Sequence, residues 1–176
     1  MTGSVPEHPR ILGTLDVEDG VGIVRIEDRR DAAVDDVWSA ITDPARLARW
    51  YGDVEGTLRL GGEFRAKVHM SGWQGTGRIT ECDPPHRLAT VSKEPDDPTE
   101  ALHTVTLTRD GDQTVVVYEN RSVPVDLLWA YGVGEQLHVE DLAGHLAGRE
   151  RDASKSRWDA LEPTYREAAE KIGPQR

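Results

Sequence analysis

Residues 34–51, VDDVWSAITDPARLARWY, carry the pattern of two short helices in succession. In the first, apolar residues recur at intervals of three and four, the period of one helix face: Val34, Val37, Trp38 and Ile41. Asp43 then provides an N-cap and Pro44 suits the first position of a second helix. Leu47 and Trp50 face inward on that helix. The stretch predicts two short helices joined by a tight turn.

The segments on both sides of this helix pair have the alternation typical of strands. Before it, Gly20–Arg29 predicts one strand. After it, a series of short alternating runs is separated by glycine, proline and aspartate turn signals. These runs predict six further strands: Val54–Leu60, Gly62–Met70, Gln74–Cys82, Arg87–Lys93, His103–Arg109 and Thr114–Asn120. No helical pattern interrupts them, so we expect an antiparallel sheet.

The helical period returns after Pro124. It predicts a long helix over Gly134–Ala147 and a second one over Ser154–Ile172, with a polar link at Arg149–Lys155. A strand, two helices, six strands and C-terminal helices make an α+β chain, with a bent antiparallel sheet of about seven strands wrapped around the long helix. We expect a loose arm over 1–12, one domain over 13–148, and a helical extension over 149–176 that packs on the same domain.

The composition narrows the possible partners. The chain has 176 residues, enough for one domain, and a formal net charge of −11 that disfavours nucleic acid. Its single cysteine forms no internal disulfide, and no basic and apolar leader precedes the first structured stretch, so we expect a reducing cytoplasm. No apolar run approaches the roughly 18 residues of a spanning helix, so membrane insertion is not expected. A homodimer is possible, but no segment specifies its interface.

Several of these motifs together resemble one known family. The helix pair at 34–51, Gly61-Gly62-Glu63-Phe64, the Gly75-x-Gly77-x-Ile79-x-Glu81 strand with Pro84-Pro85-x-Arg87-Leu88, and the strand after Asp110-Gly111-Asp112 are similar to the heat-shock-protein-90 ATPase activator homologue-like family. This family is a branch of the START-like or SRPBCC superfamily, which includes the birch-pollen allergen. The resemblance covers roughly Val21–Gly148. It implies a helix-grip fold with a cavity between sheet and long helix, and a hydrophobic small molecule or lipid as ligand. A few relatives are cyclases or aromatase-like enzymes. Relatives commonly have a tryptophan after the glycine that opens the long helix, where this chain reads Tyr131-Gly132-Val133-Gly134.

Alternation within the expected strands selects the candidate ligand-binding residues. In the strand that begins at Gly62, one face carries Phe64, Val68 and Met70, and the last strand aims Tyr118 and Asn120 inward. A buried hydroxyl and a buried amide need partners, which a ligand or other protein groups can supply. With loop and helix positions added, the expected site is Phe64, Val68, Met70, Trp73, His103, Val105, Leu107, Val116, Tyr118, Asn120, Trp129, Leu142 and Leu146.

His138, Asp141 and His145 share one face of the expected long helix, a spacing that could hold a metal. Since Leu137 and Leu142 supply the apolar contacts of that helix, the more ordinary interpretation places this stripe at the solvent edge. We therefore predict no metal site and no cofactor, and no residue is assigned as catalytic.

Three functions remain in order. The first is binding of a hydrophobic small molecule in the cavity, without catalysis. The second is a cyclase-type enzyme in which Tyr118, Asn120 or His103 orients and protonates an enolisable substrate. The third is a protein-interaction module that uses the apolar stretch Leu127–Tyr131, supported only by analogy of fold.

Overall fold

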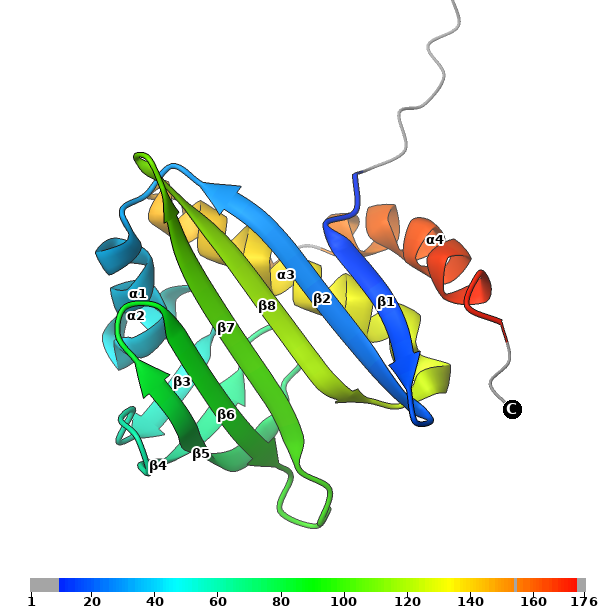
Figure 1. The fold of residues 1–176 in the computed structure, drawn as a ribbon, viewed down its shortest axis with the longest axis horizontal. Helices are drawn as coiled ribbons and strands as arrows, with labels where there is room; N and C mark the ends of the chain where they lie inside the picture. Colours follow the sequence, from blue (N-terminus) through cyan, green and yellow to red (C-terminus); the bar gives the residue numbers. More distant parts are fainter. Residues whose placement is uncertain (1–9, 154, 174–176) are drawn as a thin grey trace, which may run out of the picture.

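A computed structural model describes residues 10–153 and 155–173 (Figure 1). Its elements are β1 (Gly13–Glu18), β2 (Val21–Arg30), α1 (Val34–Thr42), α2 (Pro44–Trp50), β3 (Gly52–Gly56), β4 (Glu63–Val68), β5 (Gln74–Asp83), β6 (Arg87–Lys93), β7 (Ala101–Asp110), β8 (Gln113–Val123), a 3-10 turn (Val125–Leu127), α3 (Leu128–Leu146) and α4 (Ser156–Glu170). The described residues include no helix long and apolar enough to cross a membrane.

The strands form one antiparallel sheet in the order β1-β2-β8-β7-β6-β5-β4-β3, and the sheet curves around α3 (Figure 1). The α1–α2 pair covers one end of the same concave face. The α+β helix-grip fold is therefore confirmed, but the sheet has eight strands instead of about seven.

The additional strand is β1, which forms a hairpin with β2. Glu18 pairs with Val21, so Asp19 and Gly20 make a two-residue loop, and both have positive φ, 52° and 79°. Such a loop matches the right-handed twist of the two strands. The expected first strand, Gly20–Arg29, was therefore only the second half of a hairpin.

The long helix α3 begins at Leu128, one and a half turns before the expected start at Gly134. Leu128 and Val133 are buried in its first two turns, and this burial extends the helix through the glycines of the stretch 132–134. The earlier start moves Glu135 and Gln136 from the expected first turn to the middle of the helix.

The two ends of the described chain meet on the outer side of α3. Tyr165 of α4 is fully buried; its hydroxyl donates to Gln136 Oε1 (2.7 Å) and accepts from the Gly13 amide (3.1 Å). Gln136 Oε1 also accepts from the Leu12 amide (2.8 Å). Of the twelve positions expected to form a loose arm, the first nine lie outside the described residues, and the remainder is attached to α3 through these bonds.

Two glycines of β5 make room for aromatic rings on the concave face. A Cβ atom on Gly77 would collide with the ring of Phe64, and one on Gly75 would collide with the ring of Trp73. Both rings contact the main core cluster, which also contains the α1–α2 pair. These glycines thus allow β4 and β5 to place large apolar surfaces toward α3.

Candidate functional site

The strands β7 and β8 direct the predicted inward residues to one face. Three cross-strand pairs point toward the helix side, namely His103–Asn120, Val105–Tyr118 and Leu107–Val116. Register and alternation therefore bring together six of the thirteen residues expected to bind a ligand.

These six residues are not equally buried. Leu107 and Val116 are 1% and 2% exposed, whereas His103, Val105 and Tyr118 are only half-buried although they point inward. The helix α3 packs along β1 and β2 and not along β5–β7. The interior beneath β7 is therefore incompletely filled, as a ligand site requires.

Polar side chains from the sheet and α3 meet in this interior. The hydroxyl of Tyr118 is hydrogen-bonded to His103 Nδ1 and to the carboxyl group of Glu135. Asn120 Nδ2 donates to Glu135 Oε1 (3.2 Å), and Asn120 Oδ1 accepts from the Ser122 amide (3.0 Å), which fixes the orientation of this amide group. We call His103, Tyr118, Asn120 and Glu135 the polar cluster.

Burial dominates the electrostatics of the polar cluster. Glu135 is 9% exposed, and burial raises its pKa to about 7, although hydrogen bonds from Asn120 and Tyr118 act in the opposite direction. Burial likewise lowers the pKa of His103 to about 4, so its imidazole is neutral near pH 7. A carboxyl group that titrates near neutrality beside a neutral imidazole is equipped for proton transfer.

His138 and Tyr51 border the polar cluster. Their rings lie 5.2 Å apart between centroids, and the charge of Glu135 adds to burial in raising the pKa of Tyr51. Burial, and next the positive charge of Arg151, lower the pKa of His138 to about 4. Its Nδ1 atom is buried without a hydrogen-bond partner among the described residues. An unpaired buried nitrogen is costly, so this atom marks a place for a polar group of a ligand.

The expected stripe of His138, Asp141 and His145 does not form a metal site. His138 faces the interior, so the expectation of a solvent-edge position was wrong for it. Asp141 pairs with Arg151 (3.2 Å), and His145 accepts from Arg46 Nε (3.1 Å). Within 10–153 and 155–173, no three histidine, cysteine, aspartate or glutamate side chains are grouped as metal ligands.

Trp129 lies away from the interior, contrary to the expectation that it borders the cavity. Because α3 already begins at Leu128, Trp129 sits on the helix face that α4 covers, with the guanidinium of Arg166 3.4 Å from its ring centroid. Met70 also lies apart, against α3 at Gly134. Of the other expected apolar residues, Phe64, Trp73, Val105, Leu107, Val116, Leu142 and Leu146 belong to or contact the main core cluster, and Val68 is buried on the same face of β4 as Phe64.

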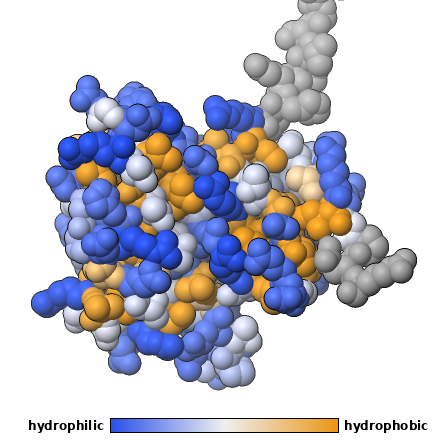
Figure 2. All heavy atoms as spheres, in the orientation of Figure 1, coloured by the Kyte–Doolittle hydropathy of each residue, from blue (hydrophilic) through white to orange (hydrophobic). Residues whose placement is uncertain are grey.

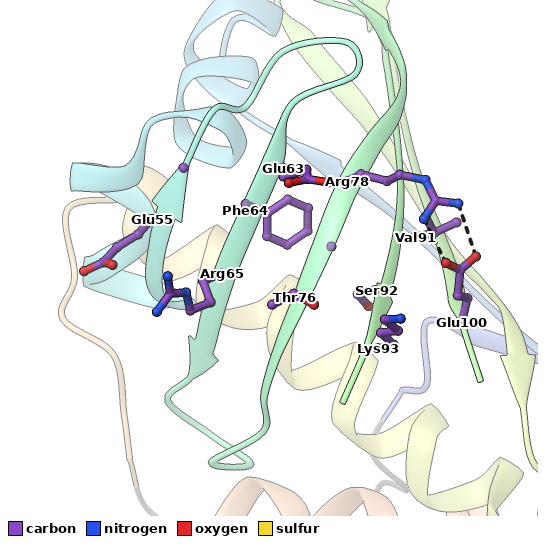
Figure 3. Close-up of a pocket in the computed structure, with 12 residues that line it drawn as sticks. Glu55, Glu63, Phe64, Arg65, Thr76, Arg78, Val91, Ser92, Lys93 and Glu100 are labelled. Carbon is purple, nitrogen blue, oxygen red and sulfur yellow. Dashed lines mark hydrogen bonds and ion pairs between the residues drawn. The ribbon is translucent and has the colours of Figure 1, made fainter. Parts of the chain in front are cut away.

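Two surface hollows differ in character from this interior. The first, about 530 Å³, has charged side chains that alternate with the core-facing residues of β3–β6, so it lies on the outer face of the sheet (Figure 3). Arg78 and Glu100 form an ion pair across it (2.8 Å). The second, about 440 Å³, lies between α3 and the segment 149–158 and contains the Arg151–Asp141 pair. Exposed charges of both signs are already paired in each hollow, so neither one offers an apolar ligand site.

Residues 31–147 match the family described as Activator of Hsp90 ATPase homolog 1-like protein, and this segment is well over half of the chain. The chain belongs to this family.

Solved structures of similar proteins extend the likeness beyond the segment that matches the Hsp90-activator-homologue-like family. CalU16 from Micromonospora echinospora is 25% identical over 93% of this chain and 96% of its own, with a TM-score of 0.71. DynU16, a protein of the dynemicin biosynthetic locus, is 26% identical over 74% of this chain and 50% of its own, with a TM-score of 0.67. An Hsp90 activator from Plasmodium falciparum shares the fold at 21% identity, with a TM-score of 0.51 over 58% of this chain and 74% of its own. No curated protein is similar enough to count as a match.

Three residues of the site in this Hsp90-activator-homologue-like chain were not expected from the sequence: Tyr51, Glu135 and His138. A helix that starts at Gly134 would place Glu135 in its first turn, where an acidic residue is ordinary and exposed. The available signal was the apolar stretch before Gly134, which is also helical in the structure.

Proposed function

We propose that the chain binds a hydrophobic small molecule between β5–β8 and α3, with a polar group of that molecule directed at His138. The observation that carries the proposal is the unpaired, buried Nδ1 atom of His138 inside an incompletely filled apolar interior. Binding would remove the cost of that unpaired nitrogen, about 1–3 kcal/mol. The membership in a family of the helix-grip fold supports the same assignment.

The surroundings of the polar cluster suit such a ligand. Half-buried apolar side chains of Phe64, Trp73, Val105 and Leu146 contact the core cluster around it and would cover the apolar part of the molecule. Tyr131 is 39% exposed, and the charges of both Glu135 and Glu94 raise the pKa of its hydroxyl. Tyr131 is thus near both the polar cluster and the loop after β6, which makes this loop the expected entrance.

Filling the interior should prevent binding. We expect Val105→Trp to weaken the binding of the neutral dye Nile red at least about tenfold, because the larger side chain occupies the same space. Thr104→Trp is the matched control, since this neighbour on β7 points to the outer face of the sheet, and it should bind as the wild type does.

Dye fluorescence gives the affinity, and circular dichroism establishes that both variants are folded. Native mass spectrometry of the purified wild type, with organic extraction, would identify a molecule that copurifies. Nile red that fails to bind the wild type, or that binds Val105→Trp with unchanged affinity, would contradict the proposal.

A further inference from the structure

The hydrogen bonds within the polar cluster form a continuous chain. The Tyr118 hydroxyl lies between His103 Nδ1 and the Glu135 carboxyl group. A phenol has one proton, so it donates to one neighbour and accepts from the other. When Glu135 is ionised, Tyr118 donates to it and His103 must donate from Nδ1. When Glu135 is protonated, both bonds reverse and His103 carries its proton on Nε2.

We propose that this chain is a proton relay through which His103 removes a proton from the bound molecule, and that the molecule is a hydrophobic ketone with a C–H bond next to its carbonyl group. The inference rests on the proposed function, because the ketone must occupy the interior described above. It adds an activity to binding, with His103 as the catalytic residue and Tyr118 and Glu135 as positioning residues that act through it.

The step is balanced in atoms and charge. His103 Nε2 takes the proton from the carbon next to the carbonyl, the C–H electron pair forms a C=C bond, and the carbonyl π pair moves to oxygen. At the same time the Nδ1 proton passes to the oxygen of Tyr118, and the hydroxyl proton passes to the Glu135 carboxylate. An enolate and a protonated Glu135 replace a ketone and an ionised Glu135. Return of a proton to carbon restores the starting state.

The free atoms of the site fit the two ends of this step. His103 is half-buried, and its Nε2 atom makes no hydrogen bond to a described residue, so a ligand can reach it. The unpaired Nδ1 atom of His138 and the hydroxyl of Tyr51, whose rings are neighbours, can serve the oxygen that gains charge. Preorganised donors at such an oxygen contribute substantially to catalysis.

The relay also improves the proton balance. Burial keeps the pKa of His103 at about 4, so the imidazole alone would hold a proton poorly, whereas Glu135 has a pKa of about 7. Transfer onward to Glu135 is therefore favourable at neutral pH. No cation faces this carboxyl group from the described residues packed against it. Its neighbours are three phenols, two neutral imidazoles, one amide and two apolar side chains of β2: Tyr51, Tyr118, Tyr131, His103, His138, Asn120, Val24 and Ile26.

The ligand-free protein already allows a test. Nitrogen-15 NMR of the His103 ring should show a neutral imidazole with its proton on Nδ1 above pH 7 and on Nε2 at pH 5.5, with the exchange of tautomers centred on the titration of Glu135. In Tyr118→Phe, where the chain is broken, the tautomer should no longer change with pH. A His103 ring that keeps one tautomer over this range, or that becomes charged within it, would overturn the relay.

The activity is tested with 2-tetralone, a bicyclic ketone with acidic C–H bonds. In D₂O the wild type should accelerate exchange of these protons, followed by proton NMR. Glu135→Gln should slow the protein-dependent rate about 10²-fold or more and remove its dependence on pH near 7, with unchanged affinity for the ketone. Binding of the ketone without exchange above the buffer rate overturns the relay alone. Absence of both ketone and Nile red binding overturns the proposed function, and the relay with it.

Discussion

Replacing Glu135 by glutamine should change how the stability of the fold depends on pH. Folding raises the pKa of this carboxyl group from 4.5 to about 7. The folded state therefore holds the proton more tightly than the unfolded state. The resulting stabilisation is complete below pH 4.5 and is lost as pH rises through about 7. At 1.36 kcal/mol per pKa unit, this loss is about 3 kcal/mol.

Glu135→Gln removes this term and keeps the shape and the hydrogen-bond acceptor for Asn120 and Tyr118. The difference in free energy of unfolding, variant minus wild type, should thus increase by about 3 kcal/mol between pH 4.5 and pH 8.5. His103 and His138 act in the opposite direction, because their lowered pKa values stabilise the fold above pH 6.5 and this stability is lost as pH falls toward 4. Since both histidines remain in the variant, their contributions largely cancel in the difference.

Urea unfolding at a series of pH values measures the difference directly. Glu167→Gln, at an exposed glutamate of α4, is the control and should follow the wild type throughout. A difference between Glu135→Gln and wild type that stays flat to within roughly 0.5 kcal/mol would show that folding does not raise the pKa of this carboxyl group. The electrostatic argument for the site would then be refuted.

Three further substitutions test the packing around the site by urea unfolding. Gly132→Ala should destabilise the fold by about 1–3 kcal/mol because its new Cβ atom would meet the Tyr165 ring, whereas Gly144→Ala on the same helix, with open space at this position, should stabilise it by up to about 1 kcal/mol. Equal effects of the two would contradict the packing of α4 on α3. Tyr165→Phe should lower the free energy of unfolding by about 1–3 kcal/mol because Gln136 and the amide that bonds the hydroxyl lose a buried partner, and a neutral result would place that hydroxyl in solvent. Asp43→Ala should cost about 1 kcal/mol through loss of the side-chain bond to the second amide of α2, and no loss would mean that the cap is not formed in solution.

Local sequence patterns predicted most of the fold because alternation and turn residues act over short distances. The hairpin of β1 was missed although its signal was present: Leu15 and Val17 alternate with polar residues before Asp19-Gly20, a preferred two-residue hairpin loop. The outer face of the sheet, where hydrophilic and hydrophobic residues are interspersed (Figure 2), shows why alternation is less regular in some strands than in others.

The site was only half predictable. Strand parity identified Tyr118 and Asn120 as inward polar residues, because the side-chain period of a strand is two. Their partner Glu135 comes from another element, and its burial depends on where α3 starts and how it crosses the sheet. Those are tertiary properties, and no pattern within a short window of sequence determines them.

The hydrogen bonds of Tyr165 join the last helix of the chain to its first strand, and both elements lie outside the segment 31–147 that matches the family. Separation of α4 from α3 would also free the Gly13 amide and expose Gln136, so β1 and α4 must open as one cooperative unit. Loss of that unit would leave β2 as the sheet edge, with a row of unpaired backbone groups next to the buried Val24 and Ile26. The two ends of the chain therefore protect the domain against self-association through its sheet, and neither end does so without the other.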